Sequence, residues 1–264
     1  MIRILFVGDV VGSAGRRALK QQLERLVDHE QVDFVVVNVE NVAGGFGITA
    51  KVLAEIDALP INVWTTGNHV WDKKEGVPLL DAHPTLLRPA NYPEGNPGRG
   101  WCVDETAAGI PVAVINLQGQ ALMPPIDNPF HVANRVLEEI AAKHPELKVI
   151  VVDMHAEATS EKQGMAWHLD GRVSAVLGTH THVPTADERI LPGGTALQTD
   201  VGMTGPYESI IGVRPAKVLE RFLYNTPRPF ETAKRGVELR AALVDVDEDT
   251  GRALDIRRVH LPCP

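Results

Sequence analysis

Short, continuously apolar runs rich in β-branched residues recur along the first two thirds of the chain. Between them, apolar residues return every three or four positions, as on the buried face of an amphipathic helix. Strands that are apolar throughout, without alternation, are typical of sheets covered on both faces, usually by helices. The pattern therefore predicts an α/β fold. The runs are Ile2–Val7, Phe34–Val39, Val63–Thr66, Val112–Leu117, Val149–Asp153 and Ala175–Gly178.

The stretches between these runs carry helix start signals. Thr49 is a suitable N-cap, because its hydroxyl can accept a hydrogen bond from a free N–H of the first helical turn. Asn128 followed by Pro129 is a cap with proline at the first helical position. We expect four helices: Ser13–His29, a short one after Thr49, one from Asn128-Pro129 to Lys143, and one from near Ser160 to Leu169.

The final third of the chain has a different pattern. Arg189–Leu191 with Thr195–Gln198, and Val237–Val246 with Ala253–Val259, are pairs of short strand-like runs around turn residues. Such pairs are typical of antiparallel hairpins. No internal repeat or linker interrupts the chain, so we expect a single domain over residues 1–264. Surface loops are expected at Pro89–Arg99 and Gln118–Asn128.

Composition excludes several classes of protein. The 26 Lys and Arg against 34 Asp and Glu give a net charge of −8, so strong nucleic-acid binding is not expected, because phosphate neutralisation supplies most of that affinity. No apolar stretch reaches the ~18 residues of a membrane-spanning helix. The first residues lack a signal-peptide pattern and are consistent with a cytoplasmic protein. Acidic domains of this size commonly form symmetric homo-oligomers.

Polar side chains with metal-binding capacity follow several of the apolar runs. In open α/β sheets, functional sites lie at the carboxyl ends of the strands, so residues in these places converge on one rim. Carboxylate, amide and imidazole groups without a thiolate suit iron, manganese or zinc. The candidate ligands are Asp9, Glu40, Asn41, Asn68, His155, His180 and His182.

This set is too large for one tetrahedral ion and favours two ions about 3.5–4 Å apart that share a carboxylate. Taken singly, some members have simpler interpretations: Asp9 as a helix cap, Asn68 as a turn residue and His155 as a satisfied buried histidine. His180 and His182 are more specific. In a regular strand their two rings would lie on the same side, each able to reach one of two adjacent ions.

Gly8-Asp9, Gly67-Asn68-His69, His155 and Gly178-Thr179-His180-Thr181-His182 resemble the motifs of the calcineurin-like metallophosphoesterases, in the same order. Two positions differ from the family pattern. Val11 stands where that family has a histidine ligand, and Glu40 stands where it has a bridging aspartate. With the glycine-rich run at 44–49, these differences resemble the YmdB-type phosphodiesterase branch.

The resemblance implies a four-layer α/β/β/α sandwich with two metal ions, most often iron or manganese with zinc as an alternative, and activity on cyclic nucleotides. By the same resemblance Asn41 replaces the missing histidine, which restores the number of ligands. One ion would be held by Asp9, Glu40, Asn41 and His182, and the other by Glu40, Asn68, His155 and His180.

The expected reaction is hydrolysis of a small phosphodiester, such as a 2′,3′- or 3′,5′-cyclic nucleotide. A water shared by two ions ionises near neutral pH and attacks phosphorus. His69, next to Asn68, is placed either to protonate the leaving oxygen or only to hydrogen-bond a ligand. The backbone of Gly44 and Gly45 either approaches a phosphate or turns the chain. Asp153 and Asp200 either orient the histidines or act as surface or capping carboxylates.

Two other functions compete with this one. The same metal centre can serve a phosphomonoesterase acting on nucleotides or phosphoproteins, because the sequence does not determine the size of the pocket. A metal-dependent regulatory protein, in which hydrolysis is incidental, is the alternative outside the enzymes. A dinucleotide-binding loop at Gly8–Gly15 is rejected, because its glycine spacing is wrong and Asp9 would face the pyrophosphate.

Overall fold

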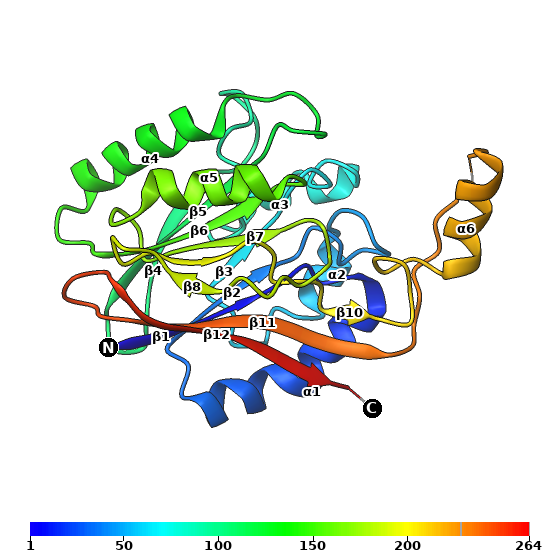
Figure 1. The fold of residues 1–264 in the computed structure, drawn as a ribbon, viewed down its shortest axis with the longest axis horizontal. Coiled ribbons are helices and arrows are strands. Elements are labelled where there is room, and N and C mark those ends of the chain that lie inside the picture. Colours follow the sequence, from blue (N-terminus) through cyan, green and yellow to red (C-terminus); the bar gives the residue numbers. More distant parts are fainter. Residues whose placement is uncertain (228, 264) are drawn as a thin grey trace.

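The computed structural model describes residues 1–227 and 229–263, which form two β-sheets and flanking helices (Figure 1). The strands are β1 (Ile2–Val7), β2 (Phe34–Asn38), β3 (Val63–Thr65), β4 (Trp101–Glu105), β5 (Pro111–Gln118), β6 (Val149–His155), β7 (Ala175–Thr179), β8 (Arg189–Ile190), β9 (Ala196–Gln198), β10 (Gly205–Pro206), β11 (Val237–Val246) and β12 (Ala253–Pro262). The helices are α1 (Gly12–Glu30), α2 (Ala50–Ala54), the short 3-10 helix η1 (Lys74–Gly76), α3 (Leu79–Ala82), α4 (Pro129–Lys143), α5 (Thr159–Leu169) and α6 (Pro215–Tyr224).

The first sheet joins the two ends of the chain. Its order is β10-β11-β1-β2-β3, and β12 pairs with β11. Strands β1, β2 and β3 are parallel, with Ile4 opposite Phe34. The predicted C-terminal hairpin is confirmed: β11 and β12 are antiparallel, and β11 also pairs antiparallel with β1. The carboxyl ends of three parallel strands therefore lie side by side in this sheet.

The second sheet has the order β4-β5-β6-β7-β9-β8. Strands β5, β6, β7 and β9 are parallel, and β4 and β8 run antiparallel at the two edges. The predicted hairpin of β8 and β9 is confirmed, but β9 also extends the parallel part of the sheet. The sequence pattern did not predict β4, because Asp104 and Glu105 interrupt its apolar run.

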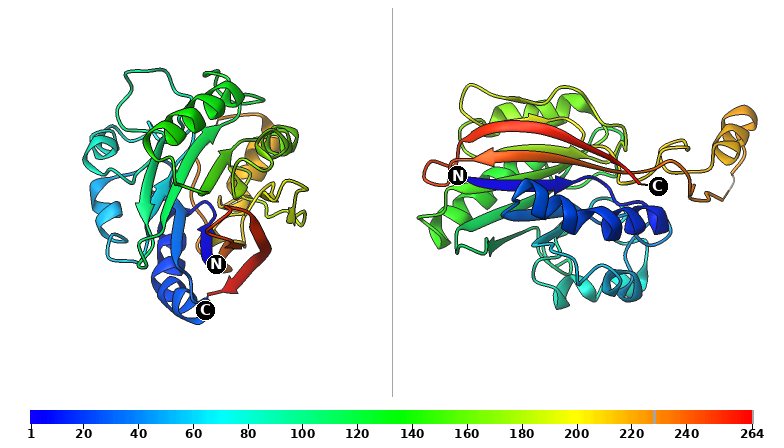
Figure 2. Two further views of the ribbon diagram at one scale, coloured as in Figure 1. Left: turned by 90° about the vertical axis from the view of Figure 1, so that its left-hand side faces the viewer. Right: turned by 90° about the horizontal axis from the view of Figure 1, so that it is seen from below.

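Alternation along β1 explains why its apolar run is unbroken. Ile4 and Phe6 pack between the two sheets, whereas Leu5 and Val7 pack against the core that includes Leu19 and Leu23 of α1. A third core lies between the second sheet and helices α4 and α5. The resulting layers are α1, sheet, sheet, and α4 with α5 (Figures 1 and 2). The predicted four-layer sandwich is confirmed.

Local capping signals place the helices as expected. The Thr49 hydroxyl accepts a hydrogen bond from the N–H of Val52, and the Asn128 side chain accepts one from the N–H of Phe130. Each such cap stabilises its helix by about 1 kcal/mol. Helix α1 is one residue longer at each end than predicted and ends at Gln31, whose left-handed φ of 54° stops it.

Helix α6 was not predicted and lies apart from the layers. It begins at Pro215 and projects away from the body of the molecule (Figure 1, and Figure 2, right). Val218 is its buried residue, and several large apolar side chains on it are exposed. Among the helices of residues 1–227 and 229–263, none has the length and apolar character needed to cross a membrane.

Candidate metal centre

The predicted ligands lie where the carboxyl ends of the parallel strands of both sheets meet. Asp9 follows β1 and Glu40 follows β2, while Asn68 comes after β3. From the second sheet, His155 is the last residue of β6 and His180 directly follows β7. Because β6 and β7 are neighbouring parallel strands, their ends lie side by side. The site therefore draws on both halves of the sandwich.

Asp153 joins the two sheets beneath this site. Its side chain is fully buried in β6 and accepts hydrogen bonds from Asn38 and Thr65 of the first sheet and from Thr179 of its own. Burial raises the pKa of Asp153 to about 6. Asn38 also accepts a hydrogen bond from the backbone N–H of Glu40. The carboxylate of Asp153 thereby fixes the distance between the strand that carries His155 and the turn that carries Glu40.

The innermost donor atoms surround one ring nitrogen. Nε2 of His155 lies 3.1 Å from Oε1 of Glu40, 3.1 Å from Oδ1 of Asn68 and 3.1 Å from Nδ1 of His180. Glu40, His155 and His180 each offer a ligand atom, and these atoms lie within 4.8 Å of one another. A ring nitrogen can form a hydrogen bond with one partner. Three potential metal-ligand atoms around it are therefore an arrangement suited to a shared cation.

Hydrogen bonds to the far side of each imidazole leave one nitrogen for a metal. Thr179 gives its hydroxyl proton to Asp153, so its oxygen accepts from Nδ1 of His155, at 2.9 Å. Nε2 of His180 lies 3.2 Å from a carboxylate oxygen of Glu157. Nδ1 of His182 donates to the carbonyl of Ile211 at 2.8 Å. Metal-binding histidines are usually oriented in this way.

The two histidines after β7 do not have the strand geometry considered from the sequence. The strand ends at Thr179, and His180 and His182 have φ values of 97° and 64°. These left-handed conformations are uncommon for residues with a side chain and are found where surrounding contacts impose them. Because a regular strand is absent, the two rings have different neighbours: His155 for His180, and the Ile211 carbonyl for His182.

Buried oxygens without hydrogen-bond partners mark the other part of the site. Oδ1 of Asp9 and Oδ1 of Asn41 are buried and accept no hydrogen bond, and the partner of the buried Oε1 of Glu40 is the His155 ring nitrogen at 3.1 Å. The remaining groups of two of these residues are engaged: Asp9 accepts from the His180 N–H, and the Asn41 amide donates to the Gly45 carbonyl. A buried acceptor left unpaired costs about 1–3 kcal/mol, and a cation would satisfy both. The donor set therefore fits a metal.

The charges of the site are strongly coupled. Burial acts to raise the pKa of Glu40, but the charge of His155 outweighs it and brings this pKa to about 2. Burial acts to lower the pKa of His155, but Glu40 and Asp9 together raise it to about 9. Burial and the charge of His155 lower the pKa of His180 to about 3. Burial also raises the pKa of Asp9. At neutral pH, Glu40 and His155 therefore form an ion pair beside a neutral His180.

His69 lies at the edge of the donor cluster. Its backbone N–H donates to Oε2 of Glu40 at 3.2 Å, which ties it to the site. Its Nδ1 lies 2.8 Å from a carboxylate oxygen of Asp72, leaving Nε2 available. The ring is partly exposed and lines a cavity of about 640 Å³ that Glu40, His180 and His182 also line. This is the position in which a side chain can exchange a proton with a molecule bound in the cavity.

The glycine loop divides between two environments. Gly45 is buried and lines the same cavity, whereas Gly44 is exposed and lines a separate, shallower pocket. The amide of Asn41 donates to Gly45, so the loop is fixed to a predicted ligand. Both glycines have positive φ, at 74° and 104°, which other residues adopt at a cost.

Comparison with known proteins identifies the family of this chain. The sequence model of the YmdB-like protein family matches residues 5–259. The chain belongs to this family. It is 46% identical over 258 residues to the 2′,3′-cyclic-nucleotide 2′-phosphodiesterase of Bacillus subtilis strain 168, covering 98% of this chain and 96% of the relative.

Two solved structures place this YmdB-like chain among phosphoesterase folds. The crystal structure described as a novel phosphatase, from Mycoplasma pneumoniae, superposes with a TM-score of 0.90 and 35% identity, over 99% of this chain and 93% of the other. The calcineurin-like phosphoesterase YfkN of Bacillus subtilis has a TM-score of 0.53 and 12% identity, over 99% and 90%. The latter likeness concerns the fold alone. The resemblance to the calcineurin-like metallophosphoesterases is thus confirmed at the level of the fold.

Some residues of the site were not identified from the sequence of this YmdB-like chain. Asp72 lies three positions after His69, a spacing that could have suggested the contact. Glu157 gave no signal, because its neighbour His180 is distant in sequence. Asp200, considered as an orienting group, accepts hydrogen bonds from both the N–H and the hydroxyl of Thr181, and from the buried Lys162. It thus anchors the residue between His180 and His182.

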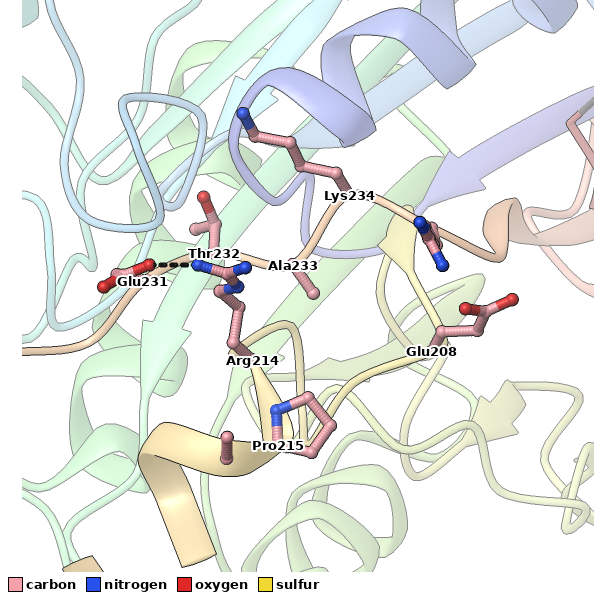
Figure 3. Close-up of a pocket in the computed structure, with 9 residues that line it drawn as sticks. Glu208, Arg214, Pro215, Glu231, Thr232, Ala233 and Lys234 are labelled. Carbon is pink, nitrogen blue, oxygen red and sulfur yellow. Dashed lines mark hydrogen bonds and ion pairs between the residues drawn. The ribbon is translucent and has the colours of Figure 1, made fainter. Parts of the chain in front are cut away.

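A second pocket lies at the base of α6 in this YmdB-like chain. It has a volume of about 570 Å³ and contains none of the predicted site residues (Figure 3). Arg214 pairs with Glu231 at 2.6 Å in this pocket, and Glu208, Lys234 and Arg235 also line it. Thr232 lines this pocket and also the cavity of the metal centre. The second pocket therefore adjoins the candidate site without supplying donors to it.

Proposed function

We propose that this chain is a metal-dependent phosphoric diester hydrolase that acts on cyclic nucleotides, with a 2′,3′- or 3′,5′-cyclic phosphate as the reacting group. The observation that carries the proposal is the cluster of buried oxygen and imidazole donors at a cavity of about 640 Å³. The activity named for the 46% identical relative supports the choice of substrate.

In this proposal two ions occupy the site, with iron or manganese as the expected metals. Asp9, Asn41 and His182 would hold one ion, and Asn68, His155 and His180 would hold the other. Glu40 would be a ligand of both. The unpaired oxygens of Asp9 and Asn41 support this assignment, as do the ligand atoms around Nε2 of His155. When bound, such ions make a water reactive near neutral pH and neutralise charge on the phosphate.

The chain's own groups then orient the ligands and move one proton. Thr179, Glu157 and the Ile211 carbonyl hold the three imidazole rings in place. As a water-derived oxygen bonds to phosphorus, the bond to one ribose oxygen breaks. His69 gives that oxygen a proton from Nε2, while Asp72 on Nδ1 stabilises the charged ring.

A substrate panel tests the proposal directly. Purified chain loaded with Mn²⁺ or Fe²⁺ is assayed with 2′,3′-cyclic AMP, 3′,5′-cyclic AMP and the monoester 3′-AMP. We expect hydrolysis of a cyclic diester to exceed hydrolysis of the monoester in kcat/KM. The variant Glu40→Gln should lose both bound metal and turnover, whereas the exposed Glu24→Gln on α1 should lose neither. Metal-loaded protein without activity on any diester would refute the proposal.

A phosphomonoesterase is the second candidate, favoured by the description of the Mycoplasma pneumoniae structure as a phosphatase. The two activities share the same metal chemistry and differ in whether the pocket accepts a second ester group. In the same panel, a kcat/KM for 3′-AMP above that for both cyclic nucleotides would select this alternative.

A further inference from the structure

The cavity of the metal centre has two chemically different kinds of lining. It is lined by the donors Glu40, His180 and His182, and by apolar residues from the loop after β2, from α6 and from the segment after it. A ligand that fills the whole cavity must therefore combine a polar, metal-seeking group with a flat or apolar group. The phenylalanines in this lining are Phe46, Phe222 and Phe230.

Two of these rings are neighbours and lie tilted to each other. The centroids of Phe46 and Phe230 are 6.4 Å apart, and their planes are inclined by 35°. This tilt is neither the edge-to-face nor the parallel offset arrangement that aromatic pairs prefer. A flat ring inserted between two others needs two contact distances of about 3.5 Å, or about 7 Å in all. A small separation of the two phenylalanines would make that space.

Each of the two rings has a further neighbour that lines the same cavity. The Phe46 ring packs edge-on against His69, with centroids 5.0 Å apart, so it is adjacent to the proposed proton donor. Phe230 is 39% exposed, although it is aromatic. The guanidinium of Arg221 on α6 lies 5.1 Å from the centroid of the Phe230 ring. Phe230 is thus bordered by Arg221 and Phe46 and remains partly open to solvent.

We propose that Phe46 and Phe230 form a slot that stacks the nucleobase of the cyclic nucleotide, and that they determine specificity for nucleotides over simple diesters. This proposal rests on the proposed function, because it assigns the phosphate to the donor residues of the same cavity. A nucleotide matches both kinds of lining, with its phosphate at the donors and its π-face at the slot. Purines should bind better than pyrimidines, because their larger rings bury more surface.

The decisive comparison uses substrates with and without a base. Metal-loaded protein is assayed with 2′,3′-cyclic AMP and with 1-O-methylribose 2′,3′-cyclic phosphate, which has the same reacting group. Phe230→Ala should lower kcat/KM for the nucleotide by about 5- to 100-fold, the range expected for one stacked base, and leave the base-free substrate unchanged. Phe230→Trp should retain the preference. Tyr224→Ala, on α6 but outside the cavity lining, should behave as wild type.

A binding measurement separates failure of the slot from failure of the proposed function. Fluorescence of 2-aminopurine riboside 3′-monophosphate should be quenched by wild-type protein and not by Phe230→Ala, whether or not any diester is hydrolysed. If wild type hydrolyses both substrates equally well, the slot is refuted while the hydrolase stands. An equal loss of kcat/KM on both substrates in Phe230→Ala would also overturn the slot. So would a change in the sedimentation of Phe230→Ala without a change in base preference, because it would make Phe230 part of a subunit interface.

Discussion

Nε2 of His155 lies 3.1 Å from Oε1 of Glu40, and both side chains are almost completely buried. The two residues come from different sheets, one at the end of β6 and the other after β2. Loss of either partner of a buried ion pair strongly destabilises the folded protein, because the other charge is left uncompensated away from water. In this pair His155 therefore carries, at the centre of the site, a positive charge that a metal ion can replace.

Metal binding should release protons from this pair. The pKa of His155 is raised to about 9 by Glu40 and Asp9 against the effect of burial, so at pH 7 its ring is protonated. Coordination through Nε2 expels that proton. The apparent metal affinity should therefore increase with pH until the pH reaches about 9, above which the ring is already neutral. His180, with a pKa of about 3, is neutral throughout and adds none. Calorimetric titration of metal-free protein with Mn²⁺ at pH 7, in buffers of different ionisation enthalpy, should give about one proton or more per protein. Binding without proton release would contradict this.

Removal of His69 should affect substrates according to their leaving groups. In His69→Ala, turnover of 2′,3′-cyclic AMP should fall by about 10²- to 10⁴-fold, because an alkoxide needs a proton as it departs. A p-nitrophenyl diester, whose leaving group departs as a stable anion, should lose far less. The turnover of Asp72→Asn should lie between those of wild type and His69→Ala, since Asp72 only holds the His69 ring. Bound metal, measured by elemental analysis, should be unchanged. Equal losses on both substrates would indicate that His69 merely supports Glu40.

Gly67 should tolerate no side chain. A Cβ at this position would lie 2.1 Å from Nε2 of His155 and 2.5 Å from Oε2 of Glu40. Gly67→Ala should therefore displace donor atoms and lower both bound metal and activity. In Gly164→Ala, within α5, the nearest atom is 3.4 Å away on Phe130, so this control should keep its metal and gain about 0.5–1 kcal/mol of helix stability. Thermal unfolding and elemental analysis of both variants test the contrast, which would disappear if Gly67 were only a turn residue.

Lys162 and Asp200 form a second buried ion pair, with Nζ and Oδ2 2.8 Å apart. Lys162→Met leaves the Asp200 charge uncompensated and should reduce the free energy of unfolding by about 3–5 kcal/mol. The exposed pair of Lys20 with Glu55, 3.7 Å apart, gives a matched control: Lys20→Met should cost no more than about 1 kcal/mol. Urea denaturation measures both. Similar small losses in the two variants would show that hydrogen bonds from Thr181 and from the N–H of Gly202 stabilise the carboxylate of Asp200 adequately.

Local sequence patterns predicted most elements of the fold correctly. The apolar run of β1 and the caps at Thr49 and Asn128 depend on neighbours in the chain, so they could be recognised there. Helix α6 escaped prediction: its apolar side chains do not pack on the layers, so burial gives it little support.

The sequence by itself determined which residue types end each strand, and hence the oxygen and imidazole character of the candidate site. Only the tertiary structure decided how they meet. Packing of the two sheets, joined by Asp153, brings Glu40 to His155 across more than a hundred residues of chain. The left-handed backbone of His180 and His182 gives their rings different neighbours, where a regular strand would have placed them on one side. These outcomes depend on contacts between distant segments, and such contacts leave no periodic pattern in the sequence.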